Sequence, residues 1–103
     1  MLLRSISATL ESIAKAIQSA LGVHVTIVDA SLEKIVSTTG ALGSIHSGSA
    51  NARSIKDKRL IFIENPRNHA DCAACGNKHL CKEFAEICAP IVFNGEAVGV
   101  IGL

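Results

Sequence analysis

The dipeptide Asn94-Gly95 separates two apolar runs, residues 89–93 and 96–101. Asparagine and glycine tolerate the positive φ that both central residues of a type I′ turn require, and the twist of this turn matches that of two antiparallel strands. The sequence therefore predicts a tight β-hairpin, which commits this end of the chain to antiparallel sheet structure.

A two-residue loop also implies a register for the hairpin. It places Phe93 opposite Glu96 and, counted outward, Cys88 opposite Ile101. Cys88 is then expected to share a face of the sheet with Ala97 and Ile101.

Apolar residues near the start of the chain recur at steps of four, three, four and four. They are Ile6, Leu10, Ile13, Ile17 and Leu21. This spacing predicts an amphipathic helix over about residues 5–21. Ser5 or Ser7 can cap its start, and Gly22 suits a left-handed conformation at its end.

Three further strands are expected. Runs rich in β-branched residues at 23–29 and 33–37 predict a second hairpin, and 59–64 predicts a strand that ends before Pro66. Residues 38–51 are rich in Gly, Ser and Ala and predict a loop with room for one short helical turn. The expected fold class is α+β, an antiparallel sheet of about five strands with helices on one face and the N-terminal helix packed on it.

The amino-acid composition excludes several classes of protein. Of the 103 residues 49% are hydrophobic and 18% charged, which excludes global disorder. The net charge is +1 and aromatic residues make up 3%, so direct nucleic-acid binding is not expected. No apolar run is long enough for a signal peptide or a membrane span, which predicts a cytoplasmic protein without membrane contact.

Four cysteines fall within seventeen residues: Cys72, Cys75, Cys81 and Cys88. A Cys-x-x-Cys pair lets two thiolates converge on one ion, and four thiolates satisfy a tetrahedral zinc ion or an iron–sulfur cluster. In a continuous helix Cys81 and Cys88 would lie about 10 Å apart, so any helix there must end before Cys88 if all four share a site. We expect these four cysteines to bind one metal ion or cluster.

Several identities for that site stay open. Only one paired knuckle is present, which slightly favours an iron–sulfur cluster over structural zinc. The cysteines could instead form a metal-free redox switch, or be inert or disulfide-bonded. His69 and His79 flank the cysteines and are expected to be exposed loop residues rather than ligands.

Sequence signatures of common enzymes are absent. The chain has no phosphate-binding loop, dinucleotide fingerprint, nucleophile elbow or His-Glu-x-x-His motif. We therefore expect no enzymatic activity.

The chain resembles a known family in several places. The residues that carry the resemblance are Val25 to Asp29, Ile63-Glu64-Asn65-Pro66-Arg67, the four cysteines, Ile87-Cys88-Ala89-Pro90-Ile91, Asn94-Gly95 and Gly99-Val100-Ile101-Gly102-Leu103. This arrangement resembles the N-terminal sensory domain, of the GAF/PAS type, of sigma-54-dependent bacterial transcription regulators.

The resemblance implies a role and partners. It implies a single sensory domain over residues 1–103, which senses a small molecule, redox state or metal status. The ATPase and DNA-binding domains of such regulators would lie outside this chain, and a homodimer is a further expectation. The last residues, 98–103, are still apolar, so we expect a domain cut from a longer chain.

Overall fold

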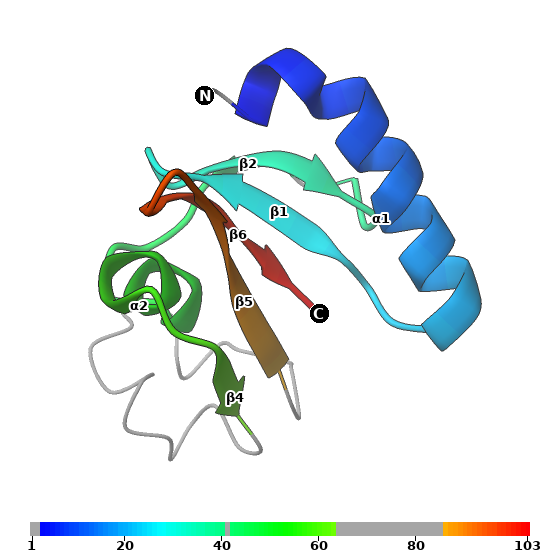
Figure 1. The fold of residues 1–103 in the computed structure, drawn as a ribbon. Coiled ribbons are helices and arrows are strands. Elements are labelled where there is room, and N and C mark those ends of the chain that lie inside the picture. The colour runs from blue at the N-terminus through cyan, green and yellow to red at the C-terminus, as the bar shows by residue number, and fades with distance from the viewer. Residues whose placement is uncertain (1–2, 41, 64–85) are drawn as a thin grey trace.

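The structure is a computed structural model that describes residues 3–40, 42–63 and 86–103. Figure 1 shows a twisted sheet with a long helix along one side and a short helix on the other. The elements, in chain order, are the 3-10 helix η1 (Leu3–Ile6), α1 (Ser7–Leu21), β1 (Thr26–Asp29), β2 (Glu33–Ser37), β3 (Gly43–Ser44), α2 (Ala50–Asp57), β4 (Ile61–Ile63), β5 (Glu86–Phe93) and β6 (Glu96–Gly102).

The strands form one antiparallel sheet in the order β3-β2-β1-β6-β5-β4. This confirms the α+β class, with six strands in the described part of the chain instead of about five. The extra strand is β3, two residues long, which pairs with the start of β2. No helix among the described residues is long and apolar enough to cross a membrane.

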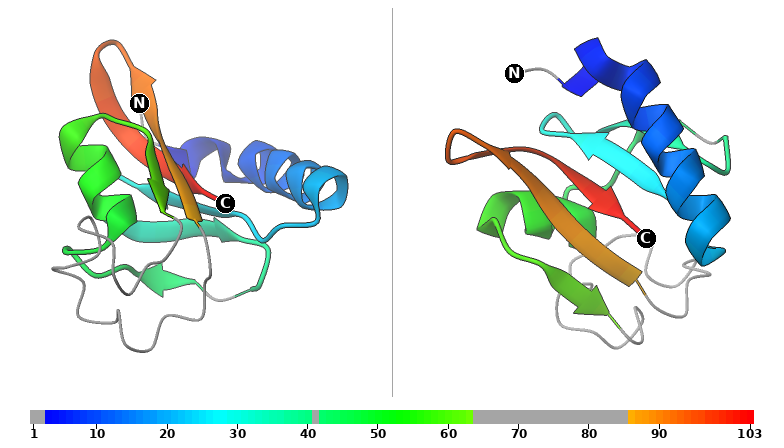
Figure 2. Two further views of the ribbon diagram at one scale, coloured as in Figure 1. Left: turned by 90° about the horizontal axis from the view of Figure 1, so that it is seen from below. Right: turned by 45° about the vertical axis from the view of Figure 1, so that its right-hand side comes forward.

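The two helices cover opposite faces of the sheet (Figures 1 and 2). Successive residues of a strand point to opposite faces, so Ile27 and Val28 enter different apolar clusters. The α1 face buries Leu3, Ala14, Val25, Ile27 and Val36. The α2 face buries Val28, Ala50, Ile61, Ile63, Cys88 and Val100. The expectation of helices on one face is therefore wrong, because strands that are apolar on both sides need a cover on each.

Helix α1 ends where the sequence predicts. Gly22 adopts the left-handed conformation with φ of 67°, and its N–H donates to the carbonyl of Gln18 at 2.8 Å. The start differs from the prediction. The N-cap is Ile6, with no side-chain cap, because the 3-10 turn of η1 precedes the helix and takes the place of a serine cap.

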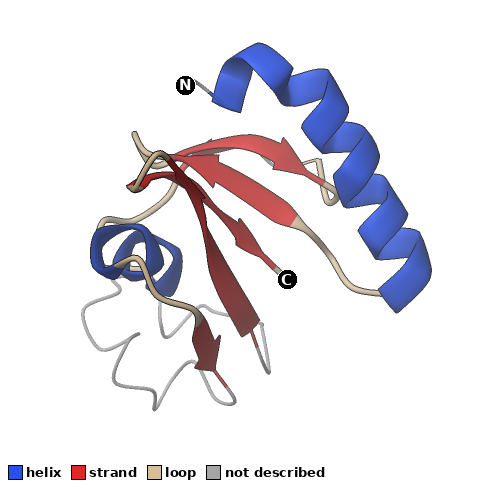
Figure 3. Cartoon of the chain, viewed as in Figure 1, coloured by secondary structure: helices blue, strands red, loops and turns tan. Residues whose placement is uncertain are grey.

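Helix α2 corrects the interpretation of residues 38–51 as a loop. Its first two residues and β3 both fall in that segment. Figure 3, coloured by secondary structure, shows the short helix below the sheet. The Ser49 side chain caps the helix by accepting a hydrogen bond from the Ala52 N–H at 3.3 Å. The capping serine was the local signal for this helix.

The β5–β6 hairpin has the predicted turn. Asn94 and Gly95 have φ of 51° and 79°, as a type I′ turn requires, and Phe93 pairs with Glu96. Beyond Val92 the register slips, because Val98 is an extra residue in β6.

The bulge changes the position of Cys88. Cys88 lies opposite Gly102, not Ile101, and it packs with Val100 on the α2 face, whereas Ile101 packs on the α1 face. The predicted pairing of Cys88 with Ile101 is therefore wrong. Beyond an extra residue in one strand, the side chains of that strand exchange the faces on which they would otherwise lie.

Candidate functional site

Cys88 is completely buried on the α2 face of the sheet. It lies on β5 opposite Ile61 of β4, and its cluster is otherwise aliphatic. The side chain is thus held by the scaffold of the sheet and does not belong to a surface loop.

Cys72, Cys75 and Cys81 lie outside the described residues, as do His69 and His79. Within residues 3–40, 42–63 and 86–103, no three His, Cys, Asp or Glu side chains lie close enough together to hold a metal ion. The four-cysteine site stays a prediction.

The strands place the two ends of the cysteine-bearing connection side by side. Ile63 at the end of β4 pairs with Glu86 at the start of β5, so the chain leaves and re-enters the sheet at neighbouring positions. Cys88 comes two residues after this re-entry point.

Two polar side chains of α2 accompany Cys88 on this face. Ser54 is completely buried, and its hydroxyl donates to the carbonyl of Arg59 at 2.8 Å and lies 3.4 Å from the carbonyl of Cys88. Asn51 donates from Nδ2 to the Glu86 carboxylate at 3.3 Å. Sequence reasoning missed both residues because it did not place a helix here.

Buried polar atoms set this region apart from the rest of the core. The Oδ1 atom of Asn51 is buried and has no hydrogen-bond partner among the described residues. Among the residues that the structure describes, Ser54 is the one polar residue that is buried as a whole. Buried polar groups of this kind need a structural or functional reason, because desolvation without a partner is costly.

A second candidate is a surface hollow of about 420 Å³ at the β1–β2 turn. Its lining includes Leu3, Arg4, Asp29, Ala30, Ser31, Glu33, Glu96, Ala97 and Val98. Charges of both signs line it, with three carboxylates and one guanidinium.

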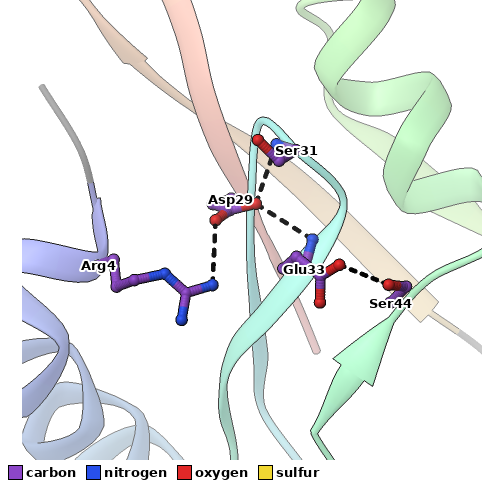
Figure 4. A network of polar contacts seen from close by, with 5 residues as sticks. All are labelled: Arg4, Asp29, Ser31, Glu33 and Ser44. Atoms are coloured by element: carbon purple, nitrogen blue, oxygen red, sulfur yellow. Dashed lines mark hydrogen bonds and ion pairs between the residues drawn. The ribbon is translucent and has the colours of Figure 1, made fainter.

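Most polar groups at this hollow already have partners within the fold (Figure 4). Asp29 Oδ1 accepts hydrogen bonds from the N–H groups of Ser31 and Glu33 at 2.9 and 3.1 Å, and Asp29 Oδ2 lies 3.7 Å from Arg4. The Ser44 hydroxyl donates to Glu33. These contacts hold the turn and anchor β3, which is a structural role.

The remaining histidines, His24 and His46, belong to no metal-binding cluster of the described residues. His24 is exposed, as its position between Val23 and Val25 suggests. His46 is also exposed, and its Nδ1 accepts a hydrogen bond from the Gly48 N–H at 3.0 Å. Neither histidine lies beside a cluster of metal-binding side chains in the described residues.

Comparison with known proteins places this geometry in a family. No family model matches the sequence. The chain is 30% identical, over 98% of its length, to UacR of Escherichia coli strain K12, whose full name is "putative uric acid sigma-54-dependent transcriptional regulator". It spans only 18% of the length of that protein.

Solved structures agree with the fold. The NLH2 GAF domain of A. aeolicus, in an inactive state, matches 93% of this chain and 65% of its own with a TM-score of 0.72 and 25% identity. Residues 122 to 287 of a methyl-accepting chemotaxis protein match 94% of this chain and 70% of that chain with a TM-score of 0.73 and 17% identity.

An enzyme shares the same fold. The type II free methionine-R-sulfoxide reductase of Thermoplasma acidophilum matches 97% of this chain and 74% of its own with a TM-score of 0.70, at 11% identity. At that identity the likeness concerns the fold alone. Sheet order, helix placement and the sequence match together show that this chain is a GAF-like domain related to sigma-54-dependent transcriptional regulators.

Proposed function

We propose that this chain is the signal-sensing domain of a bacterial transcription regulator of the sigma-54-dependent class. The observation that carries the proposal is the match to such a regulator along 98% of the chain, joined to a GAF-like fold. The domain would work in the cytoplasm and catalyse no reaction. It would pass its state to ATPase and DNA-binding domains elsewhere in a longer chain, singly or as a homodimer.

The proposed input lies on the α2 face, where Cys88 is buried. Cys72, Cys75, Cys81 and Cys88 would together hold a zinc ion or an iron–sulfur cluster. Support comes from their spacing, from the buried position of Cys88, and from the pairing of Ile63 with Glu86 that brings the ends of the connection together.

The surroundings of Cys88 fit a metal-bound thiolate in one respect. A thiolate among aliphatic side chains is costly unless a cation neutralises it, and a metal ion supplies that charge. The metal ion would stabilise the connection that bears the cysteines. Loss of the metal ion, or oxidation of the cysteines that bind it, would remove this stabilisation. The site would sense redox state or a small-molecule ligand.

Anaerobic purification of the chain, with an absorbance spectrum and elemental analysis, tests this site. Iron with acid-labile sulfide indicates a cluster, and colourless protein with about one zinc indicates a structural ion. Cys72→Ser and Cys88→Ser should each lower the metal content, whereas His24→Ala should not. Protein that contains neither metal, although protected from oxygen and chelators, would refute the metal assignment.

A metal-free thiol switch is the alternative that the cysteines themselves favour. It predicts that one cysteine pair oxidises reversibly at a cytosolic potential, and that Cys72→Ser abolishes this oxidation without unfolding the domain. Redox titration of the metal-free protein, followed by mass analysis of alkylated thiols, separates the two functions.

A further inference from the structure

Helix α2 is attached to the β5–β6 hairpin by polar side chains on one side of the helix. Asn51, Ser54 and Lys58 are three and four positions apart, so they follow a single helical face. The apolar residues Ala50 and Ile55 pack on the α2-face cluster beside them.

The contacts run along the length of the hairpin. Asn51 reaches Glu86, the first residue of β5, at 3.3 Å. Ser54 lies 3.4 Å from the Cys88 carbonyl in the next part of that strand. The third contact is at the far end, in the hairpin turn.

Lys58 makes this third contact from an unusual backbone position. Its Nζ donates to the carbonyl of Gly95 at 2.8 Å. Lys58 is the C-cap of α2 and has φ of 51°, a left-handed conformation in which glycine carries no steric penalty. A lysine at this position gives the helix end a side chain that reaches the turn, which glycine could not provide.

The hairpin tip that Lys58 holds is exposed and apolar. Val92 and Phe93 are 50% and 47% exposed, and they lie directly before Asn94-Gly95. Figure 2 shows the hairpin extending beyond the neighbouring strands at this tip.

We propose that α2 is a relay that couples the start of β5 to the tip of the β5–β6 hairpin. A displacement of Glu86, where the chain re-enters the sheet from the cysteine-bearing connection, would move Asn51 and hence the helix. Lys58 would carry that movement to Gly95. The nature of the signal that displaces Glu86 rests on the proposed function, but the mechanical coupling between the two ends of α2 does not.

Amide hydrogen exchange, measured by NMR on the whole chain, tests the coupling by perturbing one end and observing the other. Lys58→Met removes the exposed donor and keeps the length of the side chain. If α2 couples the two ends, exchange at residues 86–88 should rise by about two- to tenfold, as expected for the loss of one hydrogen bond. Asn51→Ala should raise exchange at residues 93–97 by a similar factor. Lys56→Met, on the same helix and exposed, should change neither region.

The relay is wrong if each variant changes exchange only at its own end. Lys58→Gly adds a second check, because it removes the side chain while easing the left-handed backbone, so the two ends should uncouple without loss of stability. Lys58 is exposed, so these variants do not depend on a core substitution.

A second measurement separates this inference from the proposed function. Exchange at residues 93–97 is compared in zinc-loaded and chelator-treated protein. If zinc changes exchange at residues 93–97 in the wild type, and Lys58→Met abolishes that change, both the metal site and the relay are supported. Protein that binds no metal contradicts the metal site alone, whereas metal binding that changes exchange at residues 86–88 and leaves residues 93–97 unchanged contradicts the relay.

Discussion

Gly99 lies directly against the side chain of Leu3, with no room for a methyl group between them. A Cβ at Gly99 would meet Leu3 Cδ1 and would also come within 2.5 Å of the Val28 carbonyl oxygen. Leu3 is itself 2% exposed, so the 3-10 helix at the start of the chain is packed onto β6 next to the bulge at Val98.

Gly99→Ala should therefore destabilise the domain by about 1–3 kcal/mol, the usual cost of overpacking. The Leu3 side chain could move, but the backbone carbonyl of Val28 cannot move without disturbing the pairing of β1 with β6. Urea unfolding of both proteins measures this free energy. Gly102→Ala is the matched control, since the three atoms nearest to a Cβ there all belong to the Asn51 side chain, the first of them at 3.1 Å. Equal stability of Gly99→Ala and wild type would contradict the prediction.

Asp29→Ala should loosen the β1–β2 turn, because Asp29 Oδ1 accepts two backbone hydrogen bonds. A loss of about 1–2 kcal/mol in unfolding free energy is expected from two modest hydrogen bonds. Asp29→Asn keeps an acceptor oxygen and should recover most of that loss. Arg4→Ala should change stability by less than about 1 kcal/mol, because the Arg4 side chain is largely exposed and lies 3.7 Å from Asp29. A larger effect for Arg4→Ala than for Asp29→Ala would reverse this interpretation.

Ser49→Ala should weaken α2 by removing its cap. A cost of about 0.5–2 kcal/mol is typical for the loss of an N-cap oxygen. Ser49→Asp retains an acceptor for the Ala52 N–H and should remain close to wild type. Thermal unfolding with amide exchange of residues 50–57 follows the effect, and exchange that is identical in the Ala and Asp variants would exclude a capping role.

Cys88→Val should separate packing from metal binding. Valine is close to cysteine in size and suits the aliphatic surroundings, so the unfolding free energy of metal-free protein should fall by less than about 1.5 kcal/mol. The same variant should retain less metal than wild type, because it removes a proposed ligand. Urea unfolding in chelator and elemental analysis test the two halves, and full metal retention would remove Cys88 from the site.

The elements that were predicted correctly depend on local chemistry. Asn94-Gly95 specifies its turn through the two positive φ angles, and Gly22 ends α1 in the same manner. Strand β2 agrees with the predicted residues 33–37 because its boundary is set by a short turn. Helix α2 was missed because its composition is polar, so that no run of apolar residues reveals it, and only the Ser49 cap marks its start.

The sequence alone determined helix α1, the strands β1, β2, β4, β5 and β6, the position of both hairpin turns and the presence of four clustered cysteines. Tertiary structure decided which residues of β6 share a face with Cys88, through the extra residue Val98, and it brought Asn51, Ser54 and Lys58 against a hairpin more than thirty positions away. The physical reason is the separation along the sequence of the residues that interact. Turns and caps depend on backbone preferences of a few residues, whereas a bulge and a helix contact depend on how two distant surfaces pack.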